Sequence, residues 1–140
     1  MRKKILPSMI LACFLFPPCL ALTAPEKESR AVEAMQQWLK LVDEGNYTQS
    51  WADACQYFKG MVKQDQWEQA LKGARQPLGK VLSRNLKGAE YKTSLPGAPD
   101  GEYVVIRYET SFENKKSAVE TVTAMLEKDG TWKAAGYFIQ

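Results

Sequence analysis

Residues 103–127 (YVVIRYETSFENKKSAVETVTAMLE) decide the fold of this chain. Both ends of the stretch are rich in β-branched and aromatic side chains, which favour strands. The polar sequence Glu113–Lys116 between them favours a turn. The stretch therefore predicts two antiparallel strands, Tyr103–Phe112 and Ser117–Glu127.

The segments around this hairpin extend the predicted sheet. Asp129-Gly130 is a strong turn signal, and Thr131–Ile139 after it has the composition of a strand. Residues 80–93 alternate loosely between apolar and polar side chains. The connection 96–101 contains two prolines and two glycines, which favour turns. We therefore expect about four antiparallel strands after residue 79.

The first half of the chain has helical spacing instead. Thr23 and Glu26 form the T-x-x-E pattern of a capping box, and Gly45 suits the end of the helix that follows. Three stretches carry apolar side chains every three or four residues, and the last must end by Pro77. They contain Ala31, Val32, Met35, Trp38, Leu39 and Val42; Tyr47, Trp51, Ala54, Cys55 and Phe58; and Trp67, Ala70, Leu71 and Ala74. Three N-terminal helices packed on a four-stranded antiparallel sheet predict an α+β domain.

The N-terminal residues have the layout of a secretory signal. Basic residues 2–4 precede a mainly apolar run, Ile5–Phe16, and prolines and small residues follow. This order is typical of an export signal. The run is shorter than the roughly 20 residues of a membrane-spanning helix, so we predict no transmembrane segment. We expect a signal peptide of residues 1–21 and a periplasmic or secreted protein after cleavage.

The cleavage site leaves alternatives open. Cys19 and Ala21 provide small residues at the two positions that a cut after residue 21 needs, whereas a cut three residues later would place Pro25 beside the scissile bond. Lipid attachment is disfavoured, because neither leader cysteine has the expected residues before it. The remaining residues, 22–140, are predicted to form a single α+β domain. Its lone cysteine, Cys55, is expected to be a small buried hydrophobe.

Composition and charge exclude several kinds of site. The 140 residues include no histidine, which excludes Ser-His-Asp catalysis and imidazole ligands to a metal. Three cysteines cannot alone form a four-thiolate zinc site, and we predict no metal and no cofactor. The formal charge of +3 comes from residues 2–4, since 16 basic and 16 acidic residues remain without them. We therefore predict no nucleic-acid partner, and the basic segment 59–92 is interpreted as a solvated mixed face.

Several short motifs indicate a family. They are Trp67, Arg75-x-Pro77-Leu78-Gly79, Ser83-Arg84, Pro96-Gly97-x-Pro99-Asp100-Gly101-x-Tyr103, Phe112-x-x-Lys115, Val119-Glu120-Thr121-Val122, and Gly130-x-Trp132 to Gly136-Tyr137. In this pattern, residues 22–140 resemble bacterial domain-of-unknown-function family 4019, which consists of small exported proteins without an assigned activity. The resemblance implies a cystatin-like or nuclear-transport-factor-like cone fold. Standard members of that fold insert a further helix between strands, and the sequence shows none.

Strand parity identifies two charges on apolar faces. Arg84 is predicted to share a face with Leu82 and Leu86, and Glu120 to share one with Val122. A buried charge is costly unless it is paired. We therefore expect Arg84 and Glu120 to compensate each other, with Tyr108 close by. The pair is either a structural ion pair or the floor of a ligand pocket.

The predicted function uses a cleft between helices and sheet. Its candidate ligand-binding residues are Arg84, Tyr108 and Glu120, together with Arg75 and Trp67 from the family motifs. We expect a non-enzymatic ligand-binding or accessory domain without catalytic residues, whose partner is an unknown small ligand or an envelope protein. A small pocket enzyme that uses Glu120 as a general base is a weaker alternative.

Self-association through the sheet is a further alternative. Alternation along the last strand places Trp132, Ala134 and Phe138 on one face and Ala135, Tyr137 and Ile139 on the other. A strand that is apolar on both faces is either covered on both or forms an association surface. The pattern is therefore compatible with a homodimer.

Overall fold

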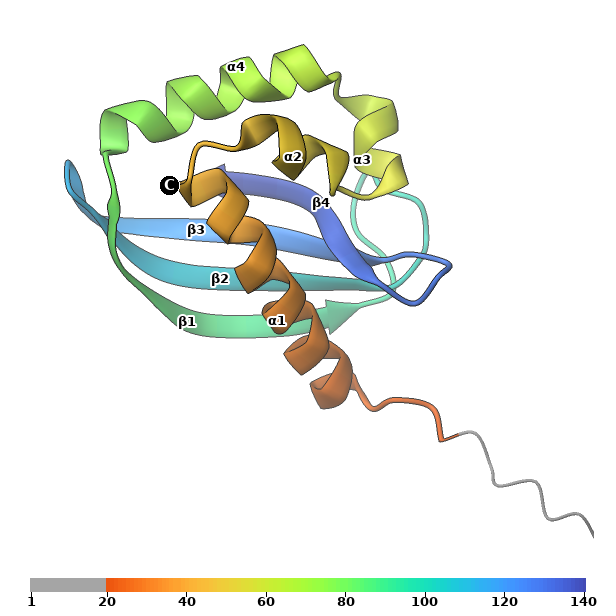
Figure 1. Ribbon diagram of the computed structural model, residues 1–140. Coiled ribbons are helices and arrows are strands. Elements are labelled where there is room, and N and C mark those ends of the chain that lie inside the picture. The colour runs from red at the N-terminus through yellow and green to blue at the C-terminus, as the bar shows by residue number, and fades with distance from the viewer. Residues whose placement is uncertain (1–19) are drawn as a thin grey trace, which may run out of the picture.

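The computed structural model describes residues 20–140, so the predicted signal peptide lies almost entirely outside the described residues (Figure 1). The first helix, α1 (Ala24–Asp43), begins at the predicted capping box. The Glu26 amide donates to Thr23 Oγ1 at 3.4 Å, and the Thr23 amide donates to the Glu26 carboxylate at 2.8 Å. After the helix ends, Gly45 adopts a φ of 78°, a conformation that costs glycine little. Within residues 20–140, no helix combines the length and hydrophobicity needed to cross a membrane.

The sheet has four antiparallel strands in sequential order. They are β1 (Val81–Lys92), β2 (Tyr103–Phe112), β3 (Lys115–Leu126) and β4 (Trp132–Ile139). Because each strand pairs with its neighbour in sequence, β1 and β4 form the two edges of the sheet. The helices lie on one side of it (Figure 1), and the predicted α+β order is confirmed.

The second apolar stretch forms two short helices rather than one. These are α2 (Tyr47–Ala52) and α3 (Gln56–Met61), so the prediction of three helices was one too few. The break occurs because Cys55 is extended and its amide donates to the Ala134 carbonyl of β4 at 2.9 Å. This tertiary hydrogen bond outweighs the helical periodicity. Cys55 is buried, as expected, and burial raises the pKa of its thiol.

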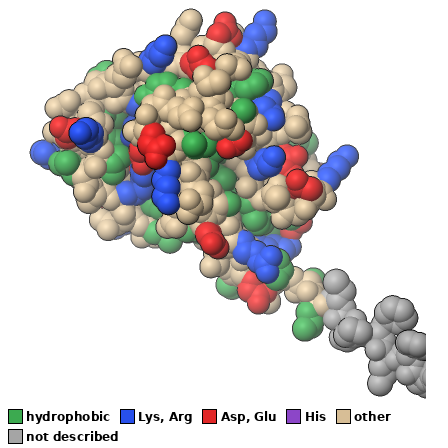
Figure 2. Space-filling model, in the orientation of Figure 1, with side chains coloured by type: hydrophobic (Ala, Val, Ile, Leu, Met, Phe, Trp, Pro, Cys, Tyr) green, Lys and Arg blue, Asp and Glu red, His purple; other side chains and the backbone are tan. Residues whose placement is uncertain are grey.

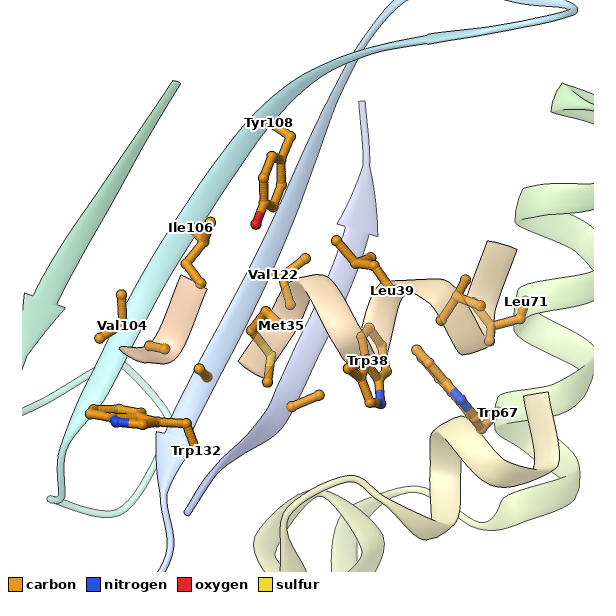
Figure 3. Packing of buried hydrophobic residues seen from close by; sticks show 14 residues of the cluster. Met35, Trp38, Leu39, Trp67, Leu71, Val104, Ile106, Tyr108, Val122 and Trp132 are labelled. Carbon is orange, nitrogen blue, oxygen red and sulfur yellow. The ribbon is translucent and has the colours of Figure 1, made fainter. Parts of the chain in front are cut away.

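The last helix, α4 (Gln64–Arg75), ends before Pro77, as predicted, and a single 3-10 turn, η1 (Gln76–Leu78), follows it. The main core lies between α1 and the sheet, where Met35 and Leu39 of α1 lie near Val122 of β3, and Ile106 of β2 belongs to the same cluster (Figure 3). Other members of this core are Ala31, Trp38, Val42, Trp67, Leu71, Val104, Tyr108, Val122, Ala124, Trp132 and Ala134. These contacts fix α1 across the sheet.

A β-bulge in β4 changes the faces predicted for that strand. Thr123 pairs with Gly136 and Ala124 pairs with Ala134, so Ala135 is the extra residue. The bulge reverses the parity beyond it. Trp132, Ala134, Tyr137 and Ile139 all face the helices, whereas Phe138 faces the opposite side. The prediction that Tyr137 and Ile139 lie opposite Trp132 was therefore wrong.

A second bulge affects the start of β1. Val81 pairs with Phe112 and Arg84 pairs with Thr110, so the two residues between them oppose Ser111 alone. Arg84 consequently faces the helices, as predicted, but Leu82 does not share its face and is 56% exposed. The extra residue in this edge strand explains why simple alternation failed there.

Candidate functional site

Six elements bring polar side chains together at one end of the helix–sheet interface. We call this group the buried ionic cluster. Its members are Asp43 of α1, Arg75 of α4, Arg84 of β1, Thr110 of β2, Glu120 of β3 and Tyr137 of β4. Two guanidinium groups thus face two carboxylates.

Glu120 is the centre of the buried ionic cluster and is fully buried. Arg84 donates from Nε to Oε1 at 2.7 Å and from Nη2 to Oε2 at 3.1 Å, which confirms the predicted pair. Thr110 Oγ1 donates to Oε1 at 2.5 Å, and the Tyr137 hydroxyl donates to Oε2. A carboxylate has about four acceptor positions, so the protein itself occupies every acceptor position of Glu120.

Asp43 joins the two arginines. Its carboxylate accepts from Arg84 Nη1 at 2.7 Å and Nη2 at 2.9 Å, and from Arg75 Nη2 at 2.9 Å. Burial alone would raise the pKa of Asp43, but hydrogen bonds from Arg84 and Arg75 outweigh it and lower the pKa. Asp43 was not among the residues predicted from the sequence. Its signal was an acid in the last turn of a helix, where it opposes the helix dipole unless a cation compensates it.

Arg75 and Tyr137 complete the buried ionic cluster. Arg75 is 5% exposed, and its Cζ lies 5.1 Å from the centroid of the Phe112 ring. Its Nη1 donates to the Tyr137 hydroxyl at 3.4 Å. Burial and the neighbouring charge of Glu120 raise the pKa of Tyr137, which therefore stays protonated and donates to that carboxylate. Strand alternation placed Tyr137 on the wrong face of β4, because it does not account for the bulge that turns this residue inward.

Tyr108 borders the buried ionic cluster without joining it. It pairs with Glu120 across the sheet and is buried, and burial raises its pKa. Within residues 20–140, its hydroxyl has no hydrogen-bond partner. The structure thus brings Arg75, Arg84 and Glu120 into one network and places Tyr108 beside it.

Trp67, the fifth predicted residue, lies among the helices. Its indole donates to Ser50 Oγ at 3.0 Å, and its ring packs 6.2 Å from Trp38 and edge-on against Phe58. Trp67 therefore does not contact the charged residues with which it was grouped.

An apolar groove lies between α4 and the edge strand β4, and we call it the α4–β4 groove. Its volume is ≈ 360 Å³. It is lined by Trp67, Ala70, Leu71, Ala74, Leu78, Lys115, Tyr137, Phe138 and Ile139. Of the five predicted residues, Trp67 lines this groove, whereas Arg75, Arg84, Tyr108 and Glu120 do not. Tyr137 belongs to both the groove and the buried ionic cluster.

The surface of the described residues carries charges of both signs. Figure 2 shows basic and acidic side chains interspersed over the face in view. Two basic residues of segment 59–92, Arg75 and Arg84, form ion pairs within the buried ionic cluster. A third, Lys87, pairs with Glu109, with 3.1 Å between Nζ and Oε2. The part of the chain that the structure describes has no group of three or more Cys, Asp or Glu side chains positioned to hold a metal ion.

These features define a class: a small α+β domain with a sequential antiparallel sheet, helices on one side and a charge-balanced ionic cluster between them. The family model described as "Protein of unknown function (DUF4019)" matches residues 34–137. The chain therefore belongs to this family, and the match spans every member of the buried ionic cluster. No curated protein matches the chain. The cone fold implied by the resemblance stays a prediction.

Proposed function

We propose that this protein is an exported, non-enzymatic binding domain whose ligand occupies the α4–β4 groove. The observation that carries the proposal is the apolar lining that α4 and β4 give this groove, whose volume of ≈ 360 Å³ is also within the range of small-ligand sites. Apolar side chains from both walls surround one lysine and one tyrosine. The proposed location depends on the layout of residues 1–21, which is that of an export signal.

In this proposal, the buried ionic cluster holds the groove in shape. Arg75 at the end of α4 bonds to Tyr137 of β4 and to Asp43 of α1. The two walls of the groove are therefore tied to each other and to the main helix, and a preformed site loses less entropy on binding. All acceptor positions of Glu120 are occupied, which argues against its use as a general base.

The proposal is tested by filling the groove. Ala74 is an exposed lining residue of α4, and Ala74→Phe should occupy the space between the helix and β4. The probe is 8-anilinonaphthalene-1-sulfonate, whose emission increases in apolar sites. We expect the variant to bind the dye about tenfold more weakly, the equivalent of about 1.4 kcal/mol.

Gln69→Phe is the matched control, because Gln69 is exposed on α4 outside the groove. It should bind the dye as the unmodified protein does, and thermal unfolding should show both variants folded. Equal dye binding by the two variants would exclude the groove as the site.

Self-association through the outer sheet face is the second candidate. The sheet side opposite the helices exposes Phe138 by 52% and Val119 by 38%. Because the bulge turns Tyr137 and Ile139 inward, this face is less apolar than the sequence predicted. Val119 does not line the groove. Under this alternative, Val119→Lys would abolish a dimer seen by light scattering and leave dye binding unchanged.

A further inference from the structure

We propose that the ligand of the α4–β4 groove is an extended polypeptide segment that pairs as an additional strand with the open edge of β4 at Tyr137 and Ile139. This inference rests on the proposed function of the groove and specifies the chemistry of its ligand. Addition of a strand to a sheet edge is a common mode of peptide recognition.

The pairing of β4 shows which backbone groups face outward. Gln140 and Val119 exchange both amide–carbonyl hydrogen bonds at 2.9 Å. In an antiparallel pair, hydrogen-bonded and non-hydrogen-bonded positions alternate. The amide and carbonyl of Phe138 therefore point toward β3. The amides and carbonyls of Tyr137 and Ile139 point away from β3. Within residues 20–140, no group forms a hydrogen bond with these outward amides and carbonyls.

The open edge is short and bounded. Toward the start of β4, the Ala134 carbonyl already accepts a hydrogen bond from the amide of Cys55, which precedes α3. The open positions therefore begin after the bulge, beside the C-terminal half of α4, which lies on the β4 side of the sheet in Figure 1. Two residues with outward amides and carbonyls offer four hydrogen bonds, enough to position a strand of four or five residues.

The groove surrounds this edge. Tyr137 and Ile139 line it from the helix side of the sheet, and Phe138 lines it from the outer side. The opposite wall presents the small side chains of Ala70 and Ala74, which are both exposed. An added strand would therefore direct every second side chain toward α4, where the alanines leave room for apolar groups.

Charge and hydrogen bonding at the groove further restrict the chemical class of the ligand. Lys115 lines the groove and forms no ion pair within residues 20–140, so it favours a peptide with an acidic group at that end. A purely apolar ligand would cover the edge of β4 and leave its amides and carbonyls without water, at about 1–3 kcal/mol each. A peptide backbone satisfies the same groups.

The first experiment selects peptides and then tests their backbone. A random octapeptide library is selected on the full-length protein, and the best peptide is synthesised with single N-methyl groups along its length. We expect binders with alternating β-branched or aromatic residues and one acidic residue. N-methylation at every second position should weaken binding at least about tenfold, whereas the intervening positions should tolerate it, because only alternate amides face β4.

The second experiment changes the protein. Ile139→Ala keeps the outward amide of residue 139, and Ile139→Pro removes it without removing a bond to β3. The proline variant should bind the selected peptide at least about tenfold more weakly than the alanine variant. Lys115→Gln should weaken binding of the acidic peptide, and Lys116→Gln, an exposed neighbour outside the groove, should not.

The outcomes separate the two proposals. If Ala74→Phe abolishes dye binding but no peptide is selected, or N-methyl effects lack the two-residue period, the groove binds ligands and the strand-addition inference is wrong. If the protein forms a dimer that Ile139→Pro disrupts, the edge pairs with a second copy and the inference of a peptide partner is wrong. Should Ile139→Pro fail to fold, the N-methyl series still decides.

Discussion

The buried ionic cluster and the α4–β4 groove lie next to each other and share Tyr137, yet they differ in what they leave available. In the cluster, the carboxylates of Asp43 and Glu120 accept hydrogen bonds from the arginines, and Glu120 has no exposed surface. Within residues 20–140, only the Nε of Arg75 is left without a partner among the buried side-chain nitrogen and oxygen atoms of these four residues. In the groove, the side chains are mostly apolar, but the edge of β4 has amides and carbonyls that are unpaired within residues 20–140. The residues that chemistry would first suggest for function are those already bonded to the protein.

The difference indicates that the charged residues on apolar faces of this domain hold its helices and strands in position. Each member of the buried ionic cluster comes from a different element, so the cluster positions α1, α4 and all four strands relative to one another. The groove depends on that positioning. Variants in the cluster should therefore change stability strongly, and variants in the groove should change binding.

The largest effect is expected when the Arg84–Glu120 pair is broken. Arg84→Met leaves the fully buried carboxylate of Glu120 without a cation, and Glu120→Gln leaves Arg84 facing Asp43 alone. Removal of one partner from a buried pair costs about 3–5 kcal/mol. The double variant should be no less stable than either single variant, as measured by the free energy of unfolding in denaturant.

Lys87 and Glu109 provide the control. They also pair between β1 and β2, but their side chains are 60% and 55% exposed. Lys87→Met and Glu109→Gln should each change stability by less than about 1 kcal/mol. Small and additive effects at Arg84 and Glu120 as well would show that the buried ionic cluster is not coupled.

The Arg84–Glu120 pair could be predicted because strand alternation is local. Glu120 interrupts an apolar row of β3, and Arg84 shares a face with Leu86 although the bulge turns Leu82 away. The cost of a buried charge then requires a partner. Asp43 and Thr110 could not be predicted in the same way. Their place in the buried ionic cluster depends on how α1 crosses the sheet, and that follows from long-range packing of residues such as Leu39.

The next largest effect on stability is expected at two tyrosines, where the same substitution to Phe should have different results. Tyr137→Phe removes a donor to Glu120 and an acceptor for Arg75, and should destabilise the protein by about 1.5–3 kcal/mol. Tyr108→Phe removes a buried hydroxyl that has no partner within residues 20–140, and should leave stability unchanged or raise it by up to about 2 kcal/mol. The free energy of unfolding of both variants is measured in denaturant. An equal loss of stability in the two variants would contradict the different hydrogen bonding of Tyr137 and Tyr108.

Bulges limited what the sequence could predict about the groove. Strand alternation has a period of two, so one extra residue exchanges the faces of every later side chain. The bulge at Ala135 placed Tyr137 and Ile139 on the same face as Trp132 and left Phe138 on the outer face. No residue type marks a bulge reliably. For this reason, the sequence favoured an association face where the structure shows an inward-facing strand end.

The smallest effect is expected at Asp43, and it depends on pH. The pKa of Asp43 is lowered from its ordinary value of 3.8, so the folded protein binds this proton more weakly than the unfolded chain does. The stabilisation from Asp43 is thus present above pH 3.8 and is lost as the pH falls below that value. Asp43 is 27% exposed, and partial exposure to water keeps the effect near 1 kcal/mol.

Asp43→Asn should therefore be less stable than the unmodified protein at pH 7, and the difference should shrink as the pH falls from 5 toward 2. Asp100, an exposed acid that forms no ion pair within residues 20–140, provides the control. Asp100→Asn should parallel the unmodified protein throughout. If Asp43→Asn also gave a parallel curve, the arginines would not be lowering the pKa of Asp43. The buried ionic cluster would then depend on Glu120 alone, and its connection to α1 would contribute little to holding the groove in shape.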